Sequence, residues 1–408
     1  MSNRPWLRFS FGFALTLLVC APALAQSQTE LVNRTQATLG PLCGTAGDAI
    51  LTSRSCNIAG GGQQAQNALT VSPREQTAAS STATQTTDTQ VSRESERLET
   101  ARLEAEAKSD GESRLGGFLN GSGGFGRVDS RGETEDYDVI GGGVQTGIDY
   151  RVSDSFVAGF GLGWNRQSSE FDSQSAVNGA SVDIGGGDIQ SDAYTPSLYG
   201  SFFSGPFHID GILTYTYLDY EFERPVVLLD VGGDIFANAH GDTDAHQIGT
   251  SLNLGYDFQM GGLSVGPRAG VDFRQTWIDG YKESGVPGFP LDYDDQEIIS
   301  FVSSLGAEGV YAISTDFGVI APHVRMTWEH EFEQDPRNID AQLFLNQGPN
   351  DDTLFTRTRS PDRDYARLGA GVSAQFAHGI SAFLDYDTVL ALSDVYHHRF
   401  TAGGRIEF

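Results

Sequence analysis

The densest group of potentially reactive side chains in the sequence is Glu329-His330-Glu331, and the pair His397-His398 follows near the C-terminus. Carboxylates and imidazoles bind metals and carry protons, so both groups could serve as ligands or as acid and base. Both lie in segments with strand-like alternation, where successive side chains point to opposite faces. His330 then points away from both glutamates, and the two histidines point away from each other. We therefore expect no catalytic residue, no metal site and no cofactor.

The cysteines and the charge balance narrow the remaining chemistry. Apart from Cys20, which falls in a leader segment, only Cys43 and Cys56 are present, and in an exported protein such a pair favours one disulfide over a metal site. The formal net charge of −28 argues against nucleic-acid binding, which needs a basic surface. A lipase or protease would need a Ser-His pair or an Asp-His group at one rim, and the alternation does not assemble one.

Residues 1–25 have the pattern of a secretory signal peptide. Arg4 and Arg8 precede or flank an apolar run over residues 9–19, and Ala23-Leu24-Ala25 supplies a small-x-small cleavage site. A signal anchor is the alternative, but the run is short of the roughly 20 apolar residues that a spanning helix needs. The mature chain is therefore expected to begin near Gln26.

Residues 26–85 form a short segment rich in Ser, Thr, Gln and Ala, which we expect to be flexible because it buries little apolar surface. In the linker that follows, residues 86–113, strong helix formers without Gly or Pro predict a polar helix over 91–108. At about 1.5 Å per residue this helix would run about 27 Å, close to the ~25 Å apolar band of a membrane barrel. A water-filled lumen would accept such a helix. The alternative is a solvated spacer in the periplasm.

From residue 114 to residue 408 the sequence alternates with a period of two, which predicts strands. Connections alternate between tight turns and long loops, as in outer-membrane barrels, which places both ends of the barrel in the periplasm. An even strand number closes such a barrel without a free edge. We count twelve strands, at about 115–127, 136–152, 155–168, 190–204, 206–222, 243–259, 262–279, 294–313, 317–333, 363–377, 379–392 and 397–408.

The two faces of these strands differ in chemistry, because only one face of a membrane barrel meets lipid. In the last strand Phe400, Ile406 and Phe408 share the apolar face. Glycines such as Gly161 and Gly163 make part of the inner wall smooth, which leaves space inside. The charged residues that we expect to face the lumen and contact the helix, for example at Glu94, Glu99 or Glu104, are Arg268, Asp272, Arg274, Arg325, Glu329, Arg367, Arg399 and Arg405. The predicted fold is an all-β membrane protein, a 12-stranded antiparallel transmembrane β-barrel with a polar helix in its lumen.

Residues 86–408 resemble the autotransporter β-domain family of type V secretion. The resemblance rests on the polar helix before twelve strands, on Trp328-Glu329-His330-Glu331-Phe332, and on the C-terminal Arg405-Ile406-Glu407-Phe408. It implies a translocator integral to the bacterial outer membrane, with Phe400, Ile406 and Phe408 forming the C-terminal assembly signal. The implied partners are outer-membrane lipid, the barrel-assembly machinery and periplasmic chaperones, and we expect a monomer.

Two features depart from the family pattern. Only about 60 residues separate Gln26 from the predicted helix, without a repeat that would build a solenoid passenger. The helix also lacks the paired Asn residues at which many members cleave. The expected function is thus a translocator that anchors or exports a short N-terminal segment, located in the lumen, the periplasm or the cell surface. A passive porin is the alternative, and a phospholipase or protease barrel is a weaker one.

Overall fold

The structure is a computed structural model that describes residues 30–37, 73–107, 114–129, 135–172, 174–175, 183–184, 186–228, 235–286, 290–333, 335–343, 353–358 and 362–408. The signal peptide expected over residues 1–25 and the cysteines Cys43 and Cys56 lie outside these ranges. Residues 30–37 are helical. Most of the segment 26–85 that we expected to be flexible is therefore not open to comparison.

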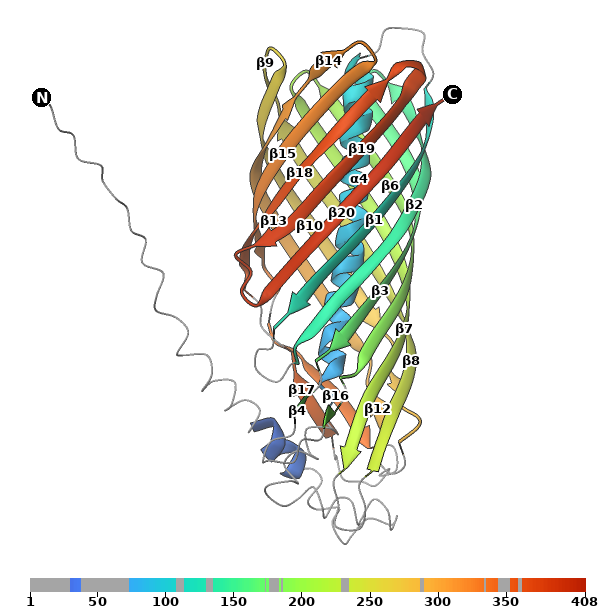
Figure 1. Ribbon diagram of the computed structural model, residues 1–408, viewed down its shortest axis with the longest axis vertical. Coiled ribbons are helices and arrows are strands. Elements are labelled where there is room, and N and C mark those ends of the chain that lie inside the picture. The colour runs from blue at the N-terminus through green and yellow to red at the C-terminus, as the bar shows by residue number, and fades with distance from the viewer. Residues whose placement is uncertain are drawn as a thin grey trace, which may run out of the picture.

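Twelve antiparallel strands close into a barrel, which confirms the predicted fold (Figure 1). Each strand pairs with its neighbours along the chain, and the first and last close the ring, with Gly116 opposite Glu407. Short strands β9 (Phe258–Met260) and β14 (Ile313–Thr315) extend two of the hairpins. The barrel strands are β1 (Leu115–Val128), β2 (Tyr137–Ser153), β3 (Phe156–Phe171), β6 (Asp188–Ser204), β7 (Phe207–Leu228), β8 (Ile235–Tyr256), β10 (Leu263–Ile278), β13 (Gln296–Tyr311), β15 (Gly318–Glu331), β18 (Asp364–Phe376), β19 (Ile380–Leu390) and β20 (Val395–Glu407).

The period of two in the sequence becomes an apolar outer face and a more polar inner one. Phe400, Ile406 and Phe408 project outward and are 49%, 51% and 66% exposed in the absence of lipid. Their neighbours Arg399 and Arg405 are buried inside the barrel. A lipid-facing strand surface needs this arrangement, because hydrocarbon solvates apolar side chains and excludes charged ones.

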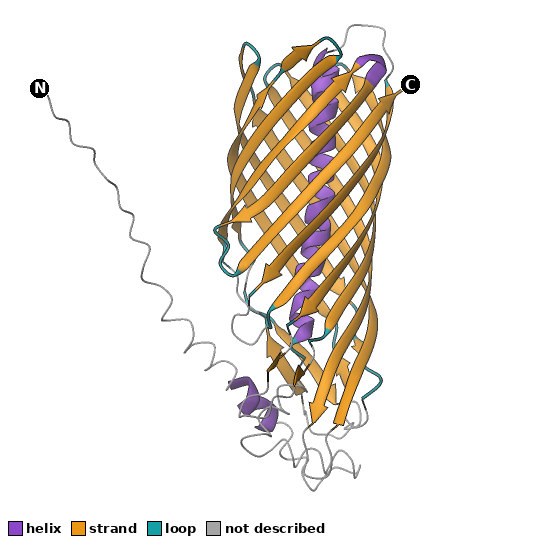
Figure 2. Cartoon of the chain, in the orientation of Figure 1, coloured by secondary structure: helices purple, strands orange, loops and turns teal. Residues whose placement is uncertain are grey.

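The two ends of the barrel differ (Figure 2). At the end that holds the C-terminus, which we call the short-turn end, the strands are joined by tight turns. Two of these turns place Gly205 and Gly261 at φ values of 58° and 68°, which favour glycine. At the other end, the hairpin end, β7 and β8 extend far beyond the rest of the wall. Four short strands form an added sheet there: β11 (Tyr281–Lys282), β12 (Leu291–Tyr293), β16 (Asn338–Leu343) and β17 (Thr353–Arg357). The two-residue strands β4 (Gln174–Ser175) and β5 (Asp183–Ile184) pair separately.

A helix passes along the lumen (Figure 2). The 3-10 turn η2 (Glu75–Ala78) leads into α4 (Ala79–Ala107), which begins at the hairpin end and finishes at the short-turn end. The alternative prediction, a solvated spacer helix in the periplasm, is therefore wrong for this helix. The predicted start is also wrong, since the helix begins at residue 79 rather than 86 or 91, whereas the predicted end at 108 lies within one residue of the observed one. The Ser/Thr-rich stretch 80–89 has weak helix propensity, and contacts with the barrel wall supply the stability that propensity lacks.

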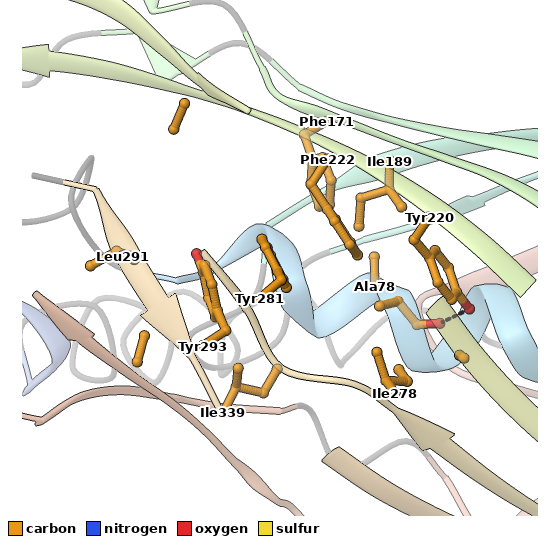
Figure 3. Close-up of a cluster of buried hydrophobic side chains, with 14 of the residues drawn as sticks. Ala78, Phe171, Ile189, Tyr220, Phe222, Ile278, Tyr281, Leu291, Tyr293 and Ile339 are labelled. Carbon is orange, nitrogen blue, oxygen red and sulfur yellow. Dashed lines mark hydrogen bonds between the residues drawn. The ribbon is translucent and has the colours of Figure 1, made fainter. Parts of the chain in front are cut away.

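The hairpin end contains an apolar core inside the barrel, which we call the hairpin-end core (Figure 3). Rings of Tyr220, Phe222, Tyr281 and Tyr293 stack in series, with centroid separations of 5.6, 5.1 and 4.6 Å. The Tyr220 hydroxyl donates to the Ala79 carbonyl over 3.2 Å, at the start of α4. The other members are Ala78, Ala79, Ala83, Val128, Tyr137, Val139, Phe171, Ile189, Ala193, Leu218, Val226, Ala239, Ala245, Ile278, Val286, Leu291, Ile339, Ala341 and Leu354. This core packs around the N-terminal end of α4.

Candidate functional site: the helix-filled lumen

The helix lies against one side of the lumen, formed by β3, β6, β7 and β8. Glycines allow this close approach. A Cβ atom at Gly161 would lie 2.8 Å from the Glu94 carboxylate, and one at Gly163 would lie within 3.1 Å of three atoms of the Gln90 amide group. At Gly249 a Cβ would come within 3.2 Å of the Thr87 methyl group. The smooth wall expected from the glycine spacing is thus the surface on which α4 docks.

Polar side chains of α4 hydrogen-bond to this wall. The Glu94 carboxylate accepts hydrogen bonds from the Gln145 amide and the Ser197 hydroxyl, and all three residues are buried. Thr87 donates to Gln247. Because each buried polar group left without a partner would cost about 1–3 kcal/mol, these pairs specify one position of the helix.

On a different face of α4, ion pairs reach the strands across the lumen. The Asp88 carboxylate contacts the guanidinium groups of Arg274 and Arg367, the latter at 3.6 Å. Arg367 also donates to Glu329 from Nε at 2.9 Å and from Nη2 at 3.2 Å. We call these four side chains the Asp88 cluster. It joins the helix to β10, β15 and β18.

The structure places all eight charged residues expected in the lumen on the inner face, but they act differently. Arg399 donates to Ser92 of α4 and to Asp387, so with Arg274 and Arg367 it contacts the helix. Among the described contacts, the other arginines bind carboxylates of the wall, and Asp272 lines a cavity. The wall pairs are Arg268 with Asp257 at 2.6 Å and Glu308 at 2.8 Å, Arg325 with Asp387 at 3.0 Å, and Arg405 with Asp149 at 2.8 Å and with Glu407.

The helix residue that meets the arginines is Asp88, which the sequence analysis did not identify. Glu94, one of the carboxylates expected in that role, faces the glycine wall instead. The side chains of Glu99 and Glu104 lie outside the described part of the chain. Asp88 was missed because the helix was expected to begin too late. The signal in the sequence is that Asp88 is the single charged residue between positions 79 and 92.

Two apolar contacts hold α4 along its length. Near its middle, Leu98 is buried against Phe118, Tyr199 and Ile212. At its start, Ala78 and Ala79 belong to the hairpin-end core. The hydrogen bonds and ion pairs of Thr87, Asp88 and Glu94 lie between these two apolar contacts. Apolar packing therefore fixes the helix on both sides of its polar contacts.

Buried ion pairs surround η2 at the hairpin end. Arg224 binds Glu283 through two hydrogen bonds of 2.8 and 2.5 Å, and Arg74 contacts Glu135 at 2.5 Å. Between them, one carboxylate oxygen of Glu75 is shielded from solvent and has no hydrogen-bond partner among the described residues. Burial, with a contribution from the Glu135 carboxylate, raises the pKa of Glu75 to about 8.

The candidate reactive groups of the sequence do not form a reaction centre. Glu329 holds Arg367, Glu331 accepts from Ser300 and from the Phe301 amide at 2.8 Å, and His330 pairs with Asp364 on the outer face at 2.8 Å. His398 is outside, with Nδ1 2.7 Å from the Tyr386 hydroxyl, while His397 borders the lumen. Within the described ranges no three His, Cys, Asp or Glu side chains gather as metal ligands.

Residues 262–266, Gly-Leu-Ser-Val-Gly, match the G-x-S-x-G pattern of hydrolase nucleophiles, although no such motif was expected from the sequence. In hydrolases this pattern forms a turn between a strand and a helix that exposes the serine. Here it spans the β9–β10 turn and the start of β10, and the Ser264 hydroxyl accepts a 3.4 Å hydrogen bond from the Gln259 amide. The strand setting does not reproduce the hydrolase geometry.

A closed barrel with an apolar exterior, a polar helix in its lumen and tight turns at one end defines an integral outer-membrane protein. In the part of the chain that is described, no helix is both long and apolar enough to cross a bilayer. A family model described as the autotransporter β-domain matches residues 117–387. The chain belongs to this autotransporter family and is a translocator barrel of the outer membrane.

Related proteins and structures agree with this assignment. The chain is 28% identical over 269 residues to the protein named Esterase EstA in Pseudomonas aeruginosa, and equally to that of Pseudomonas putida, covering 65% of this chain and 38% of each relative. It therefore spans about two fifths of the length of these relatives. The translocator domain of the autotransporter NalP from Neisseria meningitidis superimposes with a TM-score of 0.56 at 14% identity, covering 79% of this chain and 98% of that one. The β-domain of the Bordetella autotransporter BrkA gives 0.50 at 18% identity, covering 72% and 100%. At these identities the two structures support the fold alone.

Proposed function

We propose that this barrel is a permanent outer-membrane anchor that presents the residues preceding α4 at the cell surface. The supporting observation is that α4 begins at the hairpin end, where long loops mark the cell exterior, and is fixed there by the hairpin-end core. The helix contains no Asn, so it lacks the residue pair at which many family members cut. The chain then stays in one piece, with its upstream segment outside.

An epitope placed between residues 43 and 56 tests this proposal. On intact cells, antibody should bind the epitope and external protease should remove it, while the barrel remains in the membrane. A matched epitope in the turn at Gly205–Pro206, at the opposite end, should become accessible only after the outer membrane is permeabilised. Labelling of the first epitope only after permeabilisation would refute surface presentation.

We further propose that the barrel itself does not hydrolyse esters, although relatives named as esterases match it. The match covers 38% of those relatives, and the family model covers barrel residues. Purified chain should leave p-nitrophenyl butyrate unhydrolysed above the buffer rate. Turnover that disappears in Ser264→Ala, but not in the neighbouring strand variant Ser251→Ala, would show that the barrel carries a hydrolase site.

The barrel-assembly machinery and periplasmic chaperones are the proposed assembly partners, and the folded protein is proposed to be a monomer. The C-terminal strand supports the first part, because its outward aromatic and aliphatic side chains end in Phe408, which is 66% exposed. Closure of the barrel through β1 and β20 supports the second, because no unpaired barrel edge remains in the described strands to join another copy.

A further inference from the structure

Among the cavities that border α4 in the lumen, two lie on either side of the Asp88 cluster. The larger has a volume of about 520 Å³ and borders residues at the hairpin-end rim, including Arg337 and Thr358. The smaller has a volume of about 180 Å³ and extends towards the short-turn end, where it borders Arg268 and Glu308. Both volumes exceed the roughly 30 Å³ share of one water molecule, and both linings include several charged side chains that can bind water.

Three side chains line both cavities: Asp88, Arg274 and Arg367. They therefore form the partition between the two spaces. The other faces of the helix leave no comparable passage, because α4 packs directly on the glycines of β3 and β8 and bonds to Gln145 and Ser197. A route past the helix must go through the Asp88 cluster.

We propose that the helix-filled barrel retains a polar route for small inorganic ions along the Asp88 face of α4, and that the Asp88 cluster is its gate. In the closed state two guanidinium groups are neutralised by two carboxylates, Asp88 and Glu329. The pairs join the helix to β10 and β18 across the route. Opening requires these contacts to separate, which exposes both arginines to the water on either side.

The charges at the gate predict its selectivity. Removal of the Asp88 charge leaves Glu329 as the one carboxylate of the cluster beside Arg274 and Arg367, so the partition gains one net positive charge relative to the wild-type protein. Arg399 also borders the larger cavity, where Asp387 pairs with it in both states, so the change of charge comes from Asp88 alone. Chloride should therefore pass more readily than potassium once the gate is weakened, because a narrow site of low dielectric concentrates the field of unpaired charge.

The test is the conductance of the full chain in planar bilayers with KCl. Asp88→Asn should raise the conductance several-fold over the wild-type protein and shift the reversal potential in a KCl gradient towards that of chloride. Glu94→Gln is the matched control. It makes the same change on the same helix, but its carboxylate bonds to Gln145 and Ser197 and lines neither cavity, so any rise from a loosened helix should be smaller and the reversal potential should keep its wild-type value.

A second pair of variants separates a gate from an expelled helix. Gln90→Cys with Gly163→Cys should cross-link α4 to β3, because the Gln90 side chain reaches the position that a Gly163 Cβ would occupy. With the helix so fixed, Asp88→Asn should keep its raised, chloride-selective conductance. Wild-type conductance in Asp88→Asn, an equal rise in Glu94→Gln, or loss of the effect on cross-linking would each overturn the proposal. The epitope assay on the same variants reports surface presentation separately.

Discussion

At the residue scale, glycines decide where the helix can lie. Gly161 faces Glu94, Ser197 and Gln145, so any side chain there would displace the helix contacts. We expect Gly161→Val to destabilise the docked helix by about 1–3 kcal/mol, as overpacking of a filled interior does. Gly211→Ala is the control, since its Cβ would meet nothing within 4 Å. Thermal unfolding followed by heat-dependent gel migration measures both, and equal midpoints for the two variants would contradict the expectation.

Phe408 can contact the assembly machinery only because its ring is exposed at the end of the last strand. Its ring faces outward while its backbone amide donates to the Leu115 carbonyl over 3.2 Å, next to the strand pair that closes the barrel. Deletion of Phe408 should reduce the amount of barrel assembled in cells several-fold, because the last aromatic residue is the proposed contact for the assembly machinery. Phe376→Ser, which removes a 40% exposed aromatic residue at the end of β18, should have a smaller effect on the assembled amount.

At the element scale, the start of α4 should respond to pH through Glu75. The ordinary pKa of about 4.5 applies to the unfolded chain, whereas burial raises the pKa of Glu75 to about 8 in the folded one. A raised pKa means that the stabilisation is fully present below about pH 4.5 and is lost as the pH rises through about 8. Glu135, Arg74 and Arg224 are the charged groups that surround this carboxyl.

Amide hydrogen exchange of the hairpin-end strands should therefore accelerate between about pH 5 and about pH 8, after correction for the intrinsic pH dependence of exchange, and change little above that. Glu75→Gln keeps the size of the side chain and removes its titration, so its corrected exchange should be flat over this interval. An unchanged pH dependence in Glu75→Gln would show that another group is responsible.

The elements also show what the sequence could and could not predict. Strand positions and side-chain directions followed from a local period of two, which a barrel wall imposes on every strand. The start of α4 did not follow, because Ser and Thr have weak helix propensity and wall contacts such as Thr87 with Gln247 decide the outcome. Asp88 was not predicted as a contact residue because it precedes the predicted start of the helix. The hairpin-end core was also missed, although inward-facing Ile189, Leu218 and Tyr220 on neighbouring strands indicate it.

At the scale of the whole molecule, the helix and the barrel form one filled unit. Deletion of residues 26–113 should open the lumen and raise the single-channel conductance about ten-fold, because α4 with its side chains occupies a diameter of about 10–12 Å. A passive porin would instead conduct equally with and without these residues. Heat-dependent gel migration of the deletion variant establishes that the barrel is folded before the recording.

Two different solvents stabilise the two ends of the molecule: lipid surrounds the barrel wall, and water surrounds the hairpin-end core. The wall between this core and the short-turn end is stabilised in lipid, where backbone hydrogen bonds cannot be exchanged for water. The core lies at the hairpin end, from the rim of the closed wall to the extensions of β7 and β8, and its burial of Tyr220, Phe222 and Tyr281 depends on the surrounding water. Urea weakens that driving force. Moderate urea should thus detach the beginning of α4 while the barrel remains intact, so the hairpin-end core and the barrel wall would lose their structure independently.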